Sequence, residues 1–146
     1  MSFVLDASVA LLWLVPESNL AGVDYAEMAL AALKETQAVV PSLFALEAAN
    51  VVAKLESKGV VSEADSQRFI ALIGRLNVLT DQATATHALG DTLNLARRFK
   101  LSAYDAAYFE LAQRTGLHLA TLDANLAKAA TTTGVLIFKS FGSDSK

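Results

Sequence analysis

The sequence predicts one α/β domain in which a short, mostly parallel central sheet is flanked by helices. Two observations carry this prediction. Short apolar runs typical of buried strands alternate along the chain with longer, alanine-rich segments of helical periodicity. The 146 residues are 53% hydrophobic, which is enough for a full core in one domain of ordinary size. We expect the domain to cover residues 1–140 and a flexible tail to follow over residues 141–146.

Five short apolar runs are candidate strands. The last of them has strong β character, because its residues are mostly β-branched or aromatic. The predicted strands are Phe3–Leu5, Gln37–Val40, Val78–Leu79, Leu117–Leu122 and Val135–Phe138. Because helical segments separate them, we expect these strands to pair in parallel, with helices on both faces of the sheet.

The helix boundaries follow from caps, glycine and proline. Ser62 and Asp65 have the spacing of a capping box, and Pro16 is expected to stop the first helix. Gly59 and Gly116 are good residues to end helices that come before them. The predicted helices are Ser8–Leu14, Val23–Lys34, Leu43–Lys58, Ser62 to about Leu76, Thr84–Phe99, Ser102–Thr115 and Ala124–Thr132.

The composition excludes several kinds of functional site. A net charge of −3 argues against a generally basic nucleic-acid-binding protein, although an enzyme can approach phosphates through bound cations. The absence of cysteine excludes disulfides, thiolate zinc sites and a cysteine nucleophile. The two histidines, His87 and His118, are far apart in the sequence, so we expect no histidine-rich metal site.

The amino terminus and the charge content suggest where the protein works and how it assembles. The first residues have no basic region typical of a signal peptide. The longest apolar run, Val9–Val15, is far shorter than the roughly 20 residues that span a bilayer. We therefore expect a cytoplasmic protein without a membrane segment. Only 18% of the residues are charged, and this low value favours an apolar surface used in assembly, such as a homodimer.

Four carboxylates lie in apolar surroundings, where an ionised group is costly unless it is paired or binds a metal. They are Asp6, Glu47, Asp105 and Asp123. Asp6 follows the first predicted strand and Asp123 follows the fourth, so both should lie at the carboxyl edge of the sheet, where open α/β sheets bind ligands. Glu47 and Asp105 lie on largely apolar faces of their helices.

Each of these acids also has an ordinary structural interpretation. Asp6 and Asp123 have the positions of helix N-caps, and Asp105 has the spacing of a capping box. Glu47 could pair with a polar neighbour on its own helix, such as Lys54. Taken together, however, the four acids predict an all-oxygen cluster at one sheet edge, which suits Mg²⁺ or Mn²⁺ and does not suit zinc.

Four segments carry a resemblance to a known family. They are Val4–Trp13, Pro41–Asn50, Leu101–Tyr108 and Leu119–Leu126, each with one of the four acids. In their order and spacing these segments resemble PIN-domain ribonucleases, specifically the VapC-type toxins of VapBC toxin–antitoxin systems. The motifs are short, but together they extend over nearly the whole chain, and the four acidic positions show no departure from the family pattern.

The resemblance implies a PIN-like fold and an endoribonuclease that hydrolyses RNA with Mg²⁺ or Mn²⁺. It implies that Asp6, Asp105 and Asp123 bind the metal and that Glu47 binds it directly or through water. It also implies that Ser8 and Thr121 support the acidic site, and that the protein has a cognate VapB-type antitoxin.

Two further features have open interpretations. The basic run Arg97–Lys100 could contact RNA phosphates, or it could complement the dipole at the end of its helix. Trp13, Leu14 and Phe44 could form an apolar groove for an antitoxin helix, or they could belong to the core. In the first case, an arginine of the antitoxin could enter the acidic site and displace a metal.

Three other functions remain possible from the sequence. The first is a non-catalytic interaction module with the same fold, and the second is a PIN nuclease for RNA maturation without an antitoxin. The third is a receiver-type protein that is phosphorylated on aspartate. For that function Asp6 lies too early in the chain, and Lys128 and Lys139 are poorly placed.

Overall fold

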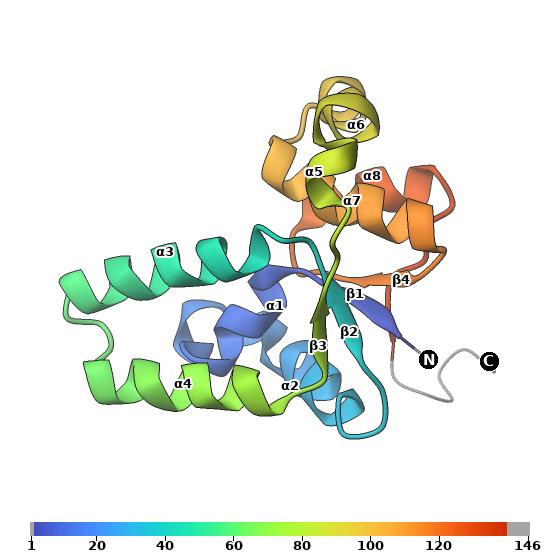
Figure 1. The fold of residues 1–146 in the computed structure, drawn as a ribbon. Helices are drawn as coiled ribbons and strands as arrows, with labels where there is room; N and C mark the ends of the chain where they lie inside the picture. The colour runs from blue at the N-terminus through green and yellow to red at the C-terminus, as the bar shows by residue number, and fades with distance from the viewer. Residues whose placement is uncertain (1, 140–146) are drawn as a thin grey trace.

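The centre of the molecule is a four-stranded parallel sheet with the strand order β3-β2-β1-β4. The computed structural model describes residues 2–139, so the tail predicted over residues 141–146 lies outside the described residues. The strands are β1 (Phe3–Leu5), β2 (Ala38–Val40), β3 (Val78–Thr80) and β4 (His118–Ala120). Helices surround this sheet, which confirms the predicted α/β class (Figure 1).

The helices lie close to their predicted positions. They are α1 (Ala7–Ala10), α2 (Val23–Ala32), α3 (Phe44–Ser57), α4 (Glu63–Arg75), α5 (Thr84–His87), α6 (Leu93–Phe99), α7 (Ala103–Thr115) and α8 (Ala124–Thr132). The capping box of Ser62 and Asp65 is complete, because each side chain accepts a hydrogen bond from the other residue's backbone N–H. Gly59 and Gly116 follow α3 and α7 with positive φ angles of 73° and 70°, which glycine adopts without steric cost.

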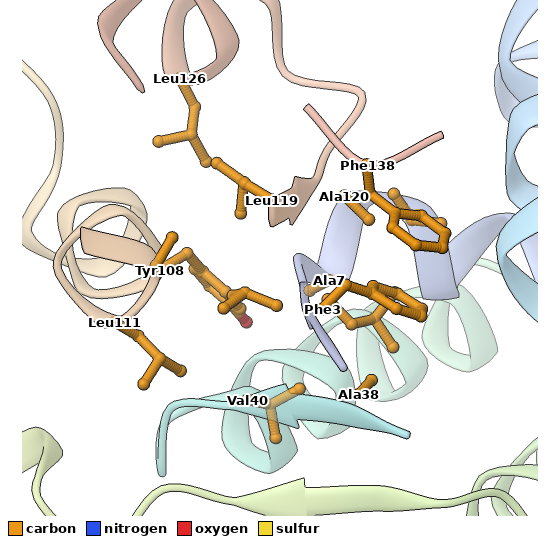
Figure 2. Packing of buried hydrophobic residues seen from close by; sticks show 14 of the residues in the cluster. Phe3, Ala7, Ala38, Val40, Tyr108, Leu111, Leu119, Ala120, Leu126 and Phe138 are labelled. Atoms are coloured by element: carbon orange, nitrogen blue, oxygen red, sulfur yellow. The ribbon is translucent and has the colours of Figure 1, made fainter. Parts of the chain in front are cut away.

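The position of β1 follows from its sequence. It lies between β2 and β4, and its three apolar residues are fully buried, as expected for a strand covered on both faces. The ring of Phe3 stacks on that of Phe138, with 3.9 Å between the centroids. Tyr108 and Leu111 of α7 fill the other side of β1 (Figure 2).

Two predicted elements differ from the structure. The segment Thr84–Phe99 is not one helix, because a π-helical turn (Ala88–Thr92) with non-helical angles at Gly90 separates α5 from α6. Glycine permits this break because it has no Cβ. The predicted strand Val135–Phe138 forms only a single parallel bridge, between Ile137 and Leu119, because β4 is three residues long and both backbone hydrogen bonds use Leu119.

The first predicted helix, Ser8–Leu14, is also shorter than expected. It becomes α1 followed by a 3₁₀ turn (Leu11–Trp13), and further 3₁₀ turns (Pro16–Ser18 and Leu20–Gly22) lead into α2. This compact start places Asp6 at the junction of β1 and α1. In Figure 1, α3 leaves β2 from the same region, while α7 and α8 lie across the sheet beside β4. The carboxyl ends of the strands therefore face the beginnings of several helices.

Candidate metal centre

Asp6 is the buried centre of the predicted site. It lies directly after β1, and the residue is only 4% exposed. Its backbone N–H donates to the carbonyl oxygen of Ala120 at 2.9 Å. Although Asp6 stands at the N-cap position of α1, its carboxylate makes no capping bond. Instead, Oδ2 accepts hydrogen bonds from the hydroxyls of Ser8 at 2.6 Å and Thr121 at 2.8 Å. The helix-cap interpretation of Asp6 is therefore wrong.

The two hydroxyls that hold Asp6 are themselves oriented by the backbone. Ser8 Oγ accepts from the N–H of Leu122 at 3.0 Å, and Thr121 Oγ1 accepts from the N–H of Asp123 at 3.0 Å. Each hydroxyl thus receives one hydrogen bond and directs its own proton to Asp6. This arrangement ties the β1–α1 junction to the β4–α8 junction, which is 115 residues away along the chain.

Glu47 lies in the first turn of α3 and has a partner that the sequence did not suggest. The hydroxyl of Tyr108 donates to Glu47 Oε1 at 2.5 Å, and Tyr108 is fully buried. No ion pair joins Glu47 to Lys54 within residues 2–139. Tyr108 follows Asp105 by three residues on α7, so helical spacing could have indicated that it lies on the same face.

Asp105 and Asp123 both lie at helix starts but use their side chains differently. Ser102 Oγ accepts from the N–H of Asp105 at 3.1 Å, but the return bond of a capping box, which Asp65 makes, is absent within the described chain. Asp123 does cap α8, because its Oδ1 accepts from the N–H of Leu126 at 3.0 Å. The cap interpretation is thus right for Asp123, and the capping bond uses one of the two carboxylate oxygens.

The four acids are close enough to influence one another's ionisation. Burial raises the pKa of Asp6, the hydroxyls of Ser8 and Thr121 lower it, and the charges of Asp105 and Asp123 raise it further. Burial also raises the pKa of Glu47, and so do the charges of Asp6 and Asp105, although the Tyr108 hydrogen bond lowers it.

The pKa of Asp105 is raised as well. Burial raises its pKa first, and the charge of Asp123 raises it further, against a lowering by the Ser102 hydroxyl. The charges of the four predicted acids therefore act on one another, although no three of them have ligand atoms within 4.8 Å of one another in the described residues.

A second group of possible metal ligands differs from the four acids because one of its carboxylates already has a cationic partner. Within residues 2–139, His87, Asp91 and Glu110 are the three metal-type residues whose ligand atoms lie within 4.8 Å of one another. Glu110, however, is already paired with Arg114, whose Nε lies 2.8 Å from Oε2. The same guanidinium binds Asp81, with 2.7 Å between Nη2 and Oδ2. A cationic side chain is therefore already paired with Glu110, the buried acid of that cluster.

The four-acid group has no such compensation. No lysine, arginine or histidine within the described residues forms an ion pair with any of its members. Its carboxylates and hydroxyls supply only oxygen, which is the donor type that hard divalent cations such as Mg²⁺ and Mn²⁺ prefer. The chemistry of this donor set fits such an ion.

Comparisons with known proteins agree with the fold. The model of the PIN domain family matches residues 3–131. The chain is 30% identical over 128 residues to Ribonuclease VapC3 of Pyrobaculum aerophilum, a match that covers 88% of this chain and 94% of that protein. It also resembles the crystal structure of PAE2754 from Pyrobaculum aerophilum, with a TM-score of 0.62 and 23% identity over 88% of this chain and 79% of that one. At this identity the structural match supports the fold alone.

The hydroxyl arrangement around Asp6 predicts a stability effect for Thr121→Val. Valine keeps the shape of threonine but removes one donor to the buried carboxylate and one acceptor for the N–H of Asp123. We expect the free energy of unfolding to fall by about 1–3 kcal/mol at pH 7, measured by urea denaturation in EDTA. Thr121→Ser, which keeps the hydroxyl, should lose less. Equal losses in both variants would show that the methyl group, not the hydrogen bonds, matters.

The raised pKa of Asp6 predicts a pH-dependent effect of Asp6→Asn. A raised pKa means that the folded protein binds the proton more tightly than the unfolded chain, so stability falls as pH rises from near 3.8 through the folded value. In metal-free buffer the asparagine variant should therefore be more stable than the parent at pH 7, and this advantage should shrink toward pH 4.

Urea denaturation between these pH values measures this difference. Asp24→Asn, at an exposed position on α2, controls for the loss of one charge. An Asp6→Asn variant that is less stable than the parent at pH 7 would contradict the predicted cost of the buried charge.

Proposed function

The chain belongs to the PIN-domain family, and we propose that it is a VapC-type endoribonuclease that hydrolyses RNA phosphodiester bonds with Mg²⁺ or Mn²⁺. The observation that carries this proposal is the group of four carboxylates without a cationic side chain, gathered around the buried Asp6. The similarity to Ribonuclease VapC3 over most of both chains supports the same activity.

In this proposal Asp6, Asp105 and Asp123 bind the metal, and Glu47 binds it directly or through water. The hydrogen bonds support this assignment because three of the acids are fixed through a single oxygen. Asp6 uses Oδ2, Asp123 uses Oδ1 and Glu47 uses Oε1. Within residues 2–139, no hydrogen bond occupies the second oxygen of these three side chains, so each is oriented and still has a donor atom for a cation.

The chemistry needs both a cation and oriented side chains. A bound divalent ion lowers the pKa of water and neutralises negative charge on the scissile phosphate. Ser8 and Thr121 keep Asp6 in one orientation, and Tyr108 does the same for Glu47. Hydrolysis by in-line attack of water would leave a 5′-phosphate and a 3′-hydroxyl.

The alternative functions differ in testable ways. Family membership excludes the receiver-type protein. A non-catalytic module would bind partners without metal-dependent cleavage, and the complete set of acids argues against it. A nuclease for RNA maturation would cleave RNA but would lack an antitoxin encoded in a neighbouring reading frame.

A VapB-type antitoxin is the protein partner in this proposal, and the structure offers a surface for it. An apolar groove of about 590 Å³ lies between α3 and α4, with Phe44, Phe69 and Ile70 among its lining residues. Ile70 is 52% exposed there. Trp13 lies in a separate, smaller hollow and donates its indole N–H to the carbonyl oxygen of Ala26 at 2.8 Å, so it partly serves the core. We therefore place the antitoxin along the groove near Phe44.

The remaining assembly and location predictions fit this function. Large apolar side chains at the surface, including Leu46 and Leu89, support a homodimer. None of the helices within residues 2–139 has the length and hydropathy to cross a bilayer. A toxin that cuts cellular RNA would act in the cytoplasm.

The proposed metal site predicts coupled losses in Asp6→Asn. At a concentration 100-fold above its Kd, Mg²⁺ or Mn²⁺ should stabilise the parent by roughly 2.7 kcal/mol, measured as a rise in melting temperature. Asp6→Asn should fold, lose most of this rise, and lose cleavage of structured RNAs in the same buffers. A variant that cleaves like the parent at limiting metal would show that Asp6 is not a ligand.

The α3–α4 groove predicts a variant that escapes the antitoxin but still cuts RNA. Ile70→Glu adds a charge to the groove and should weaken antitoxin inhibition by about 2 kcal/mol or more, the size of a typical hot spot. Leu20→Glu introduces the same charged side chain at a residue that is 76% exposed and outside the groove. Titration of the cognate antitoxin against cleavage compares the two variants. Equal inhibition of both would place the antitoxin elsewhere.

A further inference from the structure

A small cleft between α6 and α8 gathers positive charge in a protein that is acidic overall. The cleft is about 460 Å³ in volume, and Arg98, Lys100 and Lys128 line it without any acidic residue. The chain has 12 lysines and arginines and a net charge of −3. Three of these 12 cations therefore share one cleft, while the surface as a whole repels anions.

These cations are not used by the fold. Arg68 and Arg114 form ion pairs with nearby acids, but Arg98, Lys100 and Lys128 form none within the part of the chain that the structure describes. All three are exposed. The guanidinium of Arg98 lies over the ring of Phe99, 4.8 Å from its centroid, which orients it without neutralising it. Their charge is available to a ligand.

The backbone at Lys100 is a second, independent observation. Lys100 ends α6 with φ 56° and ψ 44°, the left-handed conformation. It is the sole non-glycine residue with positive φ among residues 2–139, whereas Gly59, Gly116 and Gly134 occupy the others. For a side chain such as lysine this conformation is less favourable than the right-handed one. Glycine would fit here without that cost, and lysine in its place puts a positive charge at the end of α6.

The residues of the cleft are close in the sequence to two of the four acids. Lys100 lies five positions before Asp105, in the connection that leads into α7. Asn125 also lines the cleft, and it stands in the first turn of α8, two positions after Asp123. The charge of Asp123 acts on Asp105, so these two acids lie near each other. Figure 1 shows α6 and α8 as neighbours on this side of the sheet.

We propose that the α6–α8 cleft binds phosphates of a single RNA strand next to the bond that the acidic site cleaves. This inference rests on the proposed ribonuclease function and adds the surface that holds the substrate. The cations neutralise phosphate charge, and the amide of Asn125 can donate to phosphate oxygens. The hydroxyl of Thr132 donates its own proton to the carbonyl oxygen of Lys128 at 2.8 Å, so it can accept a hydrogen bond from a 2′-hydroxyl. The scissile phosphate itself lies among carboxylates, so flanking contacts of this kind are needed to hold the strand.

The test uses a variant that lacks all three cations, Arg98→Gln with Lys100→Asn and Lys128→Gln. Asparagine is chosen at position 100 because it tolerates the left-handed backbone. The matched control, Lys34→Gln with Lys58→Gln and Arg75→Gln, removes the same charge from one arginine and two lysines. These control positions are exposed, lie at the ends of α2, α3 and α4, and do not line the cleft.

Binding is measured without cleavage, by fluorescence anisotropy of a labelled single-stranded RNA of about 16 nucleotides. The proteins carry Asp6→Asn and the buffer contains EDTA. Single-strand binding loses about 0.7 in the slope of log affinity against log salt for each phosphate contact. The cleft variant should therefore lose about 2 in slope and on the order of 100-fold in affinity at 0.1 M salt. The control should keep both values close to those of the parent.

Cleavage by the proteins with Asp6 intact gives a second measurement. The cleft variant should have a raised KM with kcat largely retained, because the cations hold the strand and take no part in the reaction. Equal RNA affinity in the cleft variant and the control would overturn the proposal, and loss of antitoxin binding alone would assign the cleft to an acidic peptide. If the parent never cleaves RNA, the proposed function fails, while the anisotropy result still decides whether the cleft binds RNA.

Discussion

The burial of the Asp6 carboxylate at the end of the central strand is the constraint on which the rest of the structure depends. A charged group so deeply buried is costly unless hydrogen bonds or a cation compensate it. Ser8 and Thr121 provide the hydrogen bonds, and the backbone N–H groups of Leu122 and Asp123 orient their hydroxyls. To meet these demands the β4–α8 junction must lie against the β1–α1 junction. One network therefore fixes the sheet edge and aligns two of the four acids.

Sequence reasoning identified the features that depend on local chemistry. The central strand, the acids that follow strands and the complete capping box at Ser62 all follow from short patterns. The same spacing at Ser102 and Asp105 gives only half a box, and in the folded chain Asp105 lies near Asp123 and Glu47. Contacts over long sequence distances were not predictable. The hydrogen bond from Tyr108 to Glu47 spans 61 residues. The break at Gly90 separates α5 from α6 although no proline is present there to predict it.

Two clusters of acids in this protein show why residue type alone does not define a metal site. Glu110 and Asp81 are held by the guanidinium of Arg114, and hydrogen bonding to these carboxylates raises the pKa of Arg114 above its ordinary value. The ion pairs of Arg114 with Glu110 and Asp81 join α7 to the residues after β3, and these two acids need no further cation. The group around Asp6 has hydroxyl partners, which share hydrogen bonds but carry no positive charge. What separates the two is the presence of a cationic side chain, and this depends on the fold.

The separation of charges also links the two ligands of the proposed enzyme. RNA phosphates are repelled by the uncompensated carboxylates and attracted by the cations of the α6–α8 cleft, which do not pair with those acids. A cation bound among the carboxylates removes the repulsion, so it should strengthen RNA binding. Because coupling between two binding equilibria is reciprocal, RNA in the cleft must strengthen metal binding by the same factor. An acidic protein can in this way hold a polyanion at the site of cleavage, because each bound ligand makes the surrounding charge more favourable for the other.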